Sequence, residues 1–411
     1  MNTYILIILT AVSMLQAQFS TNVLNGFGNN EDVISTFSES MGGMWMNNSN
    51  KNNWDPLLAS SIYSSNLTMI CVSSSIRGNK SDFYNDLSHN FEFINFSFPF
   101  KKNMGIAIGF SPNTITDYTF EEAPARIPRT EFSSALLSSS SHVIEGGISK
   151  LSVAFSKAII AENITTSIGV KWNILFGNQE VNSVSMLKEI SYNKDGSEVS
   201  SLIETVYNDT YNHFNAYQYE FDSRIIFNKK NSISLLISAI DNFKIDNDKV
   251  NQLFASSSSY SLNAIQIDRF GFGYMYNKDD DFGIAAELHF KNSIDYPKDI
   301  LLFNSLDPSI ISFHNGLYKR LNNIKIDSWN AINLSMGYNY KVIKFINQDL
   351  RDISFSVGAG ISFNEFKNNI DMSFTIGLSE NVVETIEYDN YYKLNLSIFS
   401  GDEWFKQRRR K

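Results

Sequence analysis

Hydrophobic and polar positions alternate with a period of two along most of the chain. In residues 353–363 one parity reads Ile, Phe, Val, Ala, Ile and Phe, whereas the other reads Ser, Ser, Gly, Gly and Ser. Similar alternation covers residues 164–176, 370–378 and 392–398. Successive side chains of a strand point to opposite faces, so this pattern predicts strands with one apolar face and one small polar face.

The alternating segments run to roughly ten residues or more, which is longer than the average globular strand. A tilted strand that crosses a bilayer needs about nine to eleven residues. The pattern predicts strands at residues 67–77, 89–98, 103–120, 143–157, 162–176, 217–229, 231–243, 264–277, 281–292, 308–320, 328–343, 351–364, 367–379 and 388–399.

The connections between these strands alternate between short polar turns and longer loops. The short set comprises residues 99–102, 158–161, 228–231, 277–281 and 364–367. The long set comprises residues 78–88, 121–142, 177–216, 244–263 and 293–307, and it shortens to 344–350 and 380–387 near the C-terminus.

A large soluble sandwich would also alternate its faces, but its Greek-key connections have no reason to sort by parity. Short turns on one rim and long loops on the other are typical of an outer-membrane barrel. We therefore predict an all-β fold, a transmembrane antiparallel β-barrel of about fourteen strands that occupies residues 63–400. Within loop 177–216, residues 181–192 and 198–210 predict an extracellular hairpin for ligand capture or partner contact.

The N-terminus carries an apolar run, Tyr4–Leu15, that ends close to Ala17. The run is too short to cross a hydrocarbon layer as a helix, which needs about twenty residues. A short apolar run that ends at a small residue is typical of a signal peptide, here residues 1–17. Residues 401–411 form a basic tail on the predicted periplasmic side. These features place the chain in the outer membrane of a Gram-negative bacterium, in contact with its lipids.

Composition narrows the chemistry further. The chain has 32 Phe, 19 Tyr and seven Pro, a mixture that favours strands. A net charge of −9 argues against a nucleic-acid partner. The five histidines are scattered, and no nucleophile elbow or phosphate-binding loop is present, so we expect no metal, no cofactor and no enzyme activity. A lipase built on the barrel rim is the one catalytic alternative.

Parity places several charged side chains inside the predicted barrel. Charges in such an interior pair with one another or with a plug, or else they bind a ligand, and we weigh the first reading above the second. If a carboxylate-bearing substrate passes, Arg269 and Lys393 are the first residues to test. The full set of lumen candidates is Arg269, Lys393, Lys171, Glu287 and His289, and the same parity places Asp371 inside.

Four short motifs stand out at residues 38–44, 53–64, 98–112 and 391–409. Together they resemble the FadL/TodX family of outer-membrane transporters for hydrophobic compounds. Residues 38–44 are similar to an element near the mature N-terminus of that family, and residues 53–64 resemble the stretch that enters the barrel. Residues 98–112 resemble its second and third strands, and residues 391–409 resemble its C-terminal ending. The segments occur in the family's order at both ends of the chain, although Asp55 stands where the family has Asn.

This resemblance implies a small N-terminal plug inside the barrel, which we place at residues 18–62. Its motif residues would be Met41, Gly42, Gly43, Asp55 and Pro56. The alternative is a flexible periplasmic tail. The resemblance also implies a lateral opening in the wall at a kinked third strand, with Pro112 and Asn113 as candidates. A proline there could equally lie harmlessly near the extracellular end of the strand.

The resemblance implies a monomeric channel for long-chain fatty acids or other hydrophobic small molecules, with lateral exit near the third strand. A second hypothesis is a barrel of the same fold that acts as a docking or shuttle component of a secretion or surface-assembly system. A third is a general porin, which an open conductive pore would support.

Overall fold

The structure is a computed structural model, and its description leaves out several segments, most of them in loops and at the termini. The described residues are 29–30, 34–45, 58–64, 67–80, 85–121, 125–128, 134–192, 197–251, 255–278, 281–292, 309–322, 329–344, 349–364, 366–381 and 388–402. The predicted signal peptide, Asp55, Pro56 and most of the basic tail lie outside these residues.

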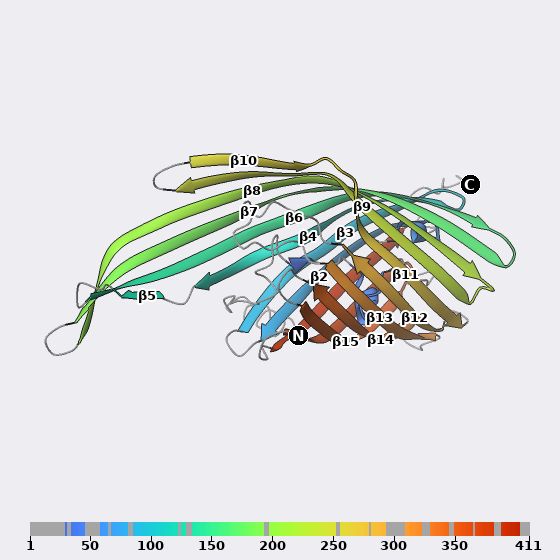
Figure 1. Cartoon of the computed structure of the whole chain (residues 1–411). Coiled ribbons are helices and arrows are strands. Elements are labelled where there is room, and N and C mark those ends of the chain that lie inside the picture. The colour runs from blue at the N-terminus through green and yellow to red at the C-terminus, as the bar shows by residue number, and fades with distance from the viewer. Residues whose placement is uncertain are drawn as a thin grey trace.

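Fourteen antiparallel strands close into a barrel in which each strand pairs with its neighbours in sequence and β17 pairs with β2. Figure 1 shows their arrangement. They are β2 (Thr68–Lys80), β3 (Asn85–Lys101), β4 (Met104–Glu121), β6 (Ser134–Ile160), β7 (Ile164–Tyr192), β8 (Glu198–Phe227), β9 (Asn231–Asn251), β11 (Gln266–Lys278), β12 (Phe282–Lys291), β13 (Ser309–Asn322), β14 (Trp329–Lys344), β15 (Asp349–Phe363), β16 (Asn368–Asn381) and β17 (Tyr388–Asp402).

Five smaller elements accompany the barrel. Two of them extend the sheet, namely β5 (Ala125–Pro128) beside β6 and β10 (Ala255–Leu262) beside β9. The other three precede the barrel in sequence: β1 (Asn29–Asn30), helix α2 (Thr36–Ser40) and the 3-10 helix η2 (Ala59–Ser64). No helix in the described part of the chain is long and apolar enough to cross a membrane.

All fourteen predicted strands are confirmed, and so is their closure into an antiparallel barrel. The tight turns follow from local conformation, because Asn103, Asn228 and Asn364 adopt the left-handed region at φ 61°, 54° and 52°. The prediction was wrong for much of loops 121–142 and 244–263, where the structure continues as strand. In residues 177–216 the barrel strands run on without interruption into the predicted hairpin.

The two faces of the barrel wall differ in the way the alternation predicts. On β16, Ile370, Phe374 and Ile376 are exposed on the outside, while the intervening Asp371 and Ser373 are buried inside. On β11, Phe270 and Phe272 face outward beside Gly271 and Gly273. An apolar outer belt of this kind is the surface that lipid solvates, whereas water would promote its aggregation.

A line of backbone irregularities crosses one side of the barrel at a single height. Gly146 and Gly147 on β6 have φ values of 118° and 143°. They lie in register with neighbouring strands, since Gly147 faces both Ile115 of β4 and Asn178 of β7. The pairing register shifts at the same level at residues 112/114, 215/217 and 267/269. We call this set of positions the bend line.

Beyond the bend line, β6, β7, β8 and β9 continue as a curved sheet that we call the arm (Figure 1). It comprises residues 134–146, 178–192, 198–214 and 244–251, together with β5 and β10. The predicted hairpin of residues 181–192 and 198–210 is confirmed and forms the far end of the arm, where Tyr192 pairs with Glu198. Strands of this length greatly exceed the nine to eleven residues that cross a bilayer, so the arm projects well beyond it.

The apolar belt contacts lipid, whereas the arm lies beyond the bilayer in water. We therefore expect a charged substitution to destabilise the fold on the outer barrel wall but not on the arm. Phe374→Lys, near the middle of β16, is expected to destabilise the barrel by about 2–4 kcal/mol. Val250→Lys, at an exposed position on the arm, is the matched control and should change stability by less than about 0.5 kcal/mol. Urea unfolding of the protein in lipid bilayers measures both. Equal effects would contradict the assignment of the belt.

Candidate functional site

The barrel wall contains a seam where β3 and β4 part. The two strands pair only from Ile94–Phe110 down to the turn at Lys101–Met104. Beyond this point the remainder of β3, residues 85–93, pairs with β2, and the remainder of β4 pairs with β6. Within the described residues, β4 has one further partner there, since Thr114 and Ile115 pair with Asn30 and Asn29 of β1.

Pro112 lies directly above the last β3–β4 pair, and Asn113 is the residue skipped where the β4–β6 register shifts. Proline lacks the N–H that a sheet ladder needs, and an inserted residue bends its strand. Phe91 and Phe110 stack at this point with their ring centroids 6.2 Å apart, and both rings are exposed. The structure thus brings the two gate candidates to the seam, and their role in a gate stays a prediction.

A small pocket lies beside the seam. Its lining includes residues of both faces of the wall, with Phe93, Asn95 and Lys150 on the inside and Phe110 on the outside. Phe93 is 2% exposed, whereas Phe110 is 37% exposed. Several residues of the inner face and Phe110 of the outer face thus meet at this pocket, at the level where the β3–β4 pairing ends.

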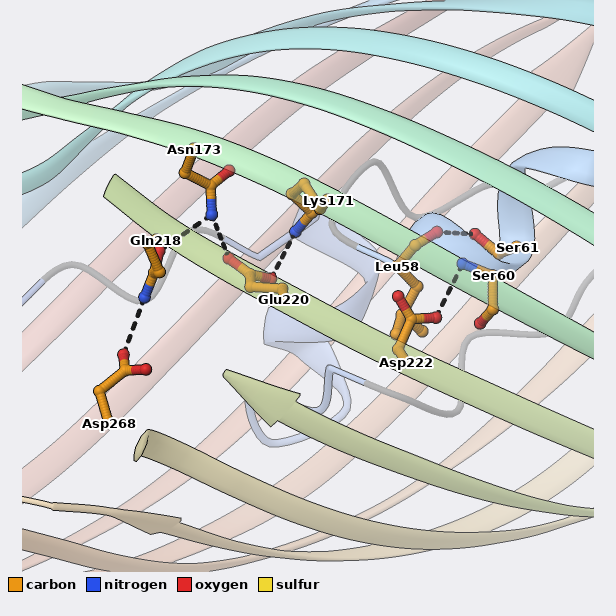
Figure 2. Close-up of polar contacts among 9 residues, drawn as sticks. All are labelled: Leu58, Ser60, Ser61, Lys171, Asn173, Gln218, Glu220, Asp222 and Asp268. Carbon is orange, nitrogen blue, oxygen red and sulfur yellow. Dashed lines mark hydrogen bonds and ion pairs between the residues drawn. The ribbon is translucent and has the colours of Figure 1, made fainter. Parts of the chain in front are cut away.

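The polar wall near this pocket is a hydrogen-bonded ladder across three strands (Figure 2). Lys171 on β7 pairs with Glu220 on β8 at 2.8 Å, and Asn173 Nδ2 donates to Glu220 at 2.6 Å. Asn173 also donates to Gln218, whose amide donates in turn to Asp268 of β11 at 2.8 Å. Buried charges need such partners, so this ladder keeps Lys171 and its neighbours in place.

Two N-terminal segments, residues 34–45 and 58–64, lie against the inner wall, and we call them the inner segments. Ser60 N–H donates to Asp222 at 2.7 Å, which ties the second segment to β8 (Figure 2). The first segment lies against β14–β16 through α2, where Ser40 hydrogen-bonds Ser335. Of the predicted plug, residues 18–62, the structure describes these segments and β1. Occlusion of the lumen by the plug remains a prediction.

The lumen candidates Arg269, Glu287 and His289 meet at Trp45 of the first inner segment. The Arg269 guanidinium lies over the Trp45 ring at 3.9 Å from its centroid, and the His289 ring lies 4.6 Å from it. The backbone N–H of Trp45 donates to the Glu287 carboxylate at 2.7 Å, and His289 Nε2 contacts the same carboxylate oxygen at 2.9 Å. All three candidates therefore contact Trp45, and Glu287 and His289 also contact each other.

Glycine lets this segment approach the wall closely. Gly42 adopts φ 83°, and a Cβ there would lie 2.6 Å from the Tyr338 carbonyl oxygen and 2.8 Å from that of Asn315. The carbonyl oxygen of Gly42 itself lies 2.7 Å from His314 Nδ1. The motif residue Met41 and the nearby Met44 pack with Phe37, Met275 and Tyr318.

The last lumen candidate, Lys393, forms an ion pair with Glu92 of β3 at 3.0 Å. Asp371 is buried in the interior, as parity predicted. Sequence reasoning missed Lys150, although its inward parity with Ser152 and Ala154 was a usable signal. It also missed Glu92, because the bulge at that residue breaks the alternation of β3. No group of three or more His, Cys, Asp or Glu side chains that could hold a metal occurs among the described residues.

The closed antiparallel barrel of fourteen strands has a fold like that of the FadL and TodX channels. The model of the family described as BamG matches residues 1–411, so the chain belongs to the BamG family. The resemblance to FadL and TodX is thus supported at the level of the fold, whereas the family itself is BamG. A comparison with curated proteins gave no match.

Three solved structures illustrate the likeness of fold. The CymD monoaromatic hydrocarbon channel aligns with a TM-score of 0.54 at 10% identity, over 93% of this chain and 99% of that one. A FadL homologue of Pseudomonas aeruginosa aligns with a TM-score of 0.54 at 9% identity, over 89% and 98%. The deltaS2S3 mutant of the TodX monoaromatic hydrocarbon channel aligns with a TM-score of 0.51 at 11% identity, over 93% and 100%.

The close approach at Gly42 yields a test of how the first inner segment is held. Gly42→Ala places a Cβ against two backbone carbonyls at a positive φ, so it should loosen residues 36–44 and raise their amide exchange at least about tenfold. Gly109→Ala is the control, because its Cβ would meet mainly the Asn95 side chain. Hydrogen–deuterium exchange measures both, and unchanged protection in Gly42→Ala would show that the segment is held elsewhere.

Proposed function

We propose that this protein is an outer-membrane channel for hydrophobic small molecules, of the fatty acid class, which leave the barrel sideways through the β3–β4 seam. The observation that carries the proposal is the pocket beside the seam, which is lined by residues of the inner face together with Phe110 of the outer face. A hydrophobic solute gains nothing by entering the aqueous periplasm, whereas a lateral exit delivers it directly to lipid.

The lining suits an amphipathic solute with a negative head group. Phe93 and Phe110 offer apolar contact, and Lys150 and Lys171 supply positive charge on the inside. Lys171 is 5% exposed, whereas Lys150 is half-buried, so an entering solute reaches Lys150 more readily and we assign the head group to it. Arg269 and Lys393, the cations singled out from the sequence, contact Trp45 and Glu92 and are proposed to hold the interior together.

Transport is tested by the movement of radiolabelled oleate and of small sugars across proteoliposomes that contain the refolded protein. We expect saturable oleate flux without sugar leakage. Pro112→Ala supplies a backbone donor at the seam and should reduce oleate flux severalfold. Pro99→Ala, in the paired part of β3, is the control and should leave flux unchanged. Sugar leakage would favour a porin, and equal flux in both proline variants would refute the lateral route.

The role of Lys150 has its own test. Lys150→Gln should reduce oleate flux about fivefold, the equivalent of about 1 kcal/mol for one lost charge contact. Flux of an uncharged aromatic hydrocarbon should not change, since it offers no head group. Lys157→Gln, on the exposed outer face of the same strand, is the control. A matching loss for both solutes would indicate damage to the wall instead of lost recognition.

The second candidate is a docking or shuttle component of a secretion or surface-assembly system. The arm favours this role, because a channel for small molecules has no need of a sheet that extends so far beyond the bilayer. Absence of flux for oleate, hydrocarbon and sugar alike, from protein that retains its fold, would place this candidate first.

A further inference from the structure

The inner wall of the barrel holds a buried carboxylate that has no basic partner. Asp371 of β16 is 2% exposed, and its Oδ2 accepts from Asn369 at 2.5 Å. Among the described residues no lysine, arginine or histidine pairs with it, whereas Glu220 and Glu92 each have a lysine partner. Its Oδ1 has no hydrogen-bond partner there either. A buried carboxylate of this kind is costly unless a cation or a proton compensates its charge.

The partnerless oxygen of Asp371 lies over β15, next to a second side chain without partners. Gly360 of β15 pairs with Asp371 on one side and with Asn333 of β14 on the other. A Cβ on Gly360 would lie 1.9 Å from Asp371 Oδ1 and 3.7 Å from Asn333 Nδ2, so glycine is what lets the carboxylate lean toward Asn333. Asn333 is 1% exposed, and within the described chain neither its Oδ1 nor its Nδ2 has a hydrogen-bond partner.

Two more oxygens of this kind lie on the other neighbour of β16, which is β17. Ser397 pairs with Asp371 in register, and Asn395 is the next inward-facing residue of the same strand. Both side chains are buried, and the described residues offer no hydrogen-bond partner to Ser397 Oγ or Asn395 Oδ1. We call the five residues Asn333, Gly360, Asp371, Asn395 and Ser397 the polar niche. Buried polar atoms usually have a partner, so four neighbouring strands that leave theirs open to one place point to a ligand.

Other parts of the interior enclose the polar niche. On the side away from the tight turns lies α2, whose Ser40 hydrogen-bonds Ser335 of β14 and whose Thr36 contacts Ser73 of β2 at 3.4 Å. On the turn side the next inward-facing residue of β17 is Phe399, which belongs to a buried apolar cluster. A ligand of the niche is therefore small and lies away from bulk water.

We propose that the polar niche binds a monovalent metal cation, with Asp371 Oδ1 and the amide oxygen of Asn333 as its protein ligands. A half-turn of the amide exchanges the oxygen and nitrogen of Asn333, and neither atom has a hydrogen bond that fixes the orientation. Ser397 Oγ and Asn395 Oδ1 supply further oxygens nearby. Oxygen atoms are the ligands of hard cations, and one carboxylate balances one positive charge. Calcium takes six to eight oxygen ligands, usually with more than one carboxylate among them.

The site lies on strands other than those of the seam, so the proposal goes beyond the transport function and does not depend on it. Its role is to compensate the charge of Asp371 and to hold β14, β16 and β17 together beneath α2. Binding to the folded state alone stabilises that state, so the stability of the barrel should depend on the cation.

The thermal stability of the full-length protein in detergent micelles tests this dependence, with sodium as the probe. Sodium chloride replaces choline chloride at constant ionic strength, because choline is too large for the niche. From about 1 to about 300 mM sodium we expect Tm to rise by at least about 2 °C. Asp371→Asn removes the charge at nearly constant shape and should abolish the rise. Asp352→Asn, at a buried carboxyl that accepts from Tyr391, is the matched control and should retain it.

Two further measurements locate the ion. Asn333→Ala keeps the charge but removes a ligand, so it should raise the sodium concentration needed for the same rise in Tm severalfold. Thallium(I), which replaces alkali-metal cations and scatters anomalously, should give a peak between Asp371 and Asn333 in crystals of the wild-type protein. The same peak should be absent from Asp371→Asn.

The difference in Tm between the two salts is read within each variant, so a general loss of stability does not affect it. The proposal is overturned if the wild-type protein has the same Tm in both salts, if Asp371→Asn keeps the sodium response, or if thallium does not bind at the niche. Equal Tm values in both salts, with Asp371→Asn at least as stable as the wild type, would show that a proton compensates Asp371 instead.

Discussion

The structure depends on one constraint, which is that backbone hydrogen bonds have no water to replace them inside a bilayer. The barrel satisfies it by closing β17 onto β2, so that strands within the wall have partners on both sides. The seam is the exception inside the wall, because β3 and β4 separate above Ile94–Phe110 and β4 instead pairs with β1 at Thr114 and Ile115. The proposed exit therefore lies where the ladder of strand pairing between β3 and β4 ends.

The interior obeys a related rule. Removing charges from water costs several kcal/mol for each ion unless partners replace the water. Lys171 and Lys393 each have a carboxylate partner on another strand, Glu220 and Glu92. Arg269 lies against Trp45, a residue that comes from outside the barrel strands. Any movement of the first inner segment would therefore expose Arg269 and Glu287 together, which couples the position of that segment to the electrostatics of the lumen.

The sequence predicted the barrel well because lipid and lumen impose opposite demands on successive residues. Strands such as β15 and β16 alternate sharply, and their bounds agree within two residues with the prediction. The arm was underestimated because water lies beyond the bilayer, so strand residues there need no apolar face; residues 138–141 are four serines in succession. The contacts of Trp45 and Gly42 were not predictable, since they depend on segments without any periodicity. The inward position of Glu92 was not predicted, because the bulge at this residue interrupts the period-two alternation of β3.

The bend line connects the seam with the arm. When β4 bends at Pro112 and Asn113, the neighbouring strands must bend at the same height or lose their hydrogen bonds. Gly147 and Gly177 meet this demand, because a Cβ on Gly147 would lie 2.2 Å from the Thr114 carbonyl oxygen and one on Gly177 would lie 2.0 Å from that of Gly147. Side chains at either position would force the strands apart. The glycines thus transmit the bend from β4 through β6 to β7, so the irregularity that opens the wall also directs the arm away from it. A change in the conformation of the seam is therefore expected to change the direction of the arm, which links the two candidate roles of this protein through one continuous sheet.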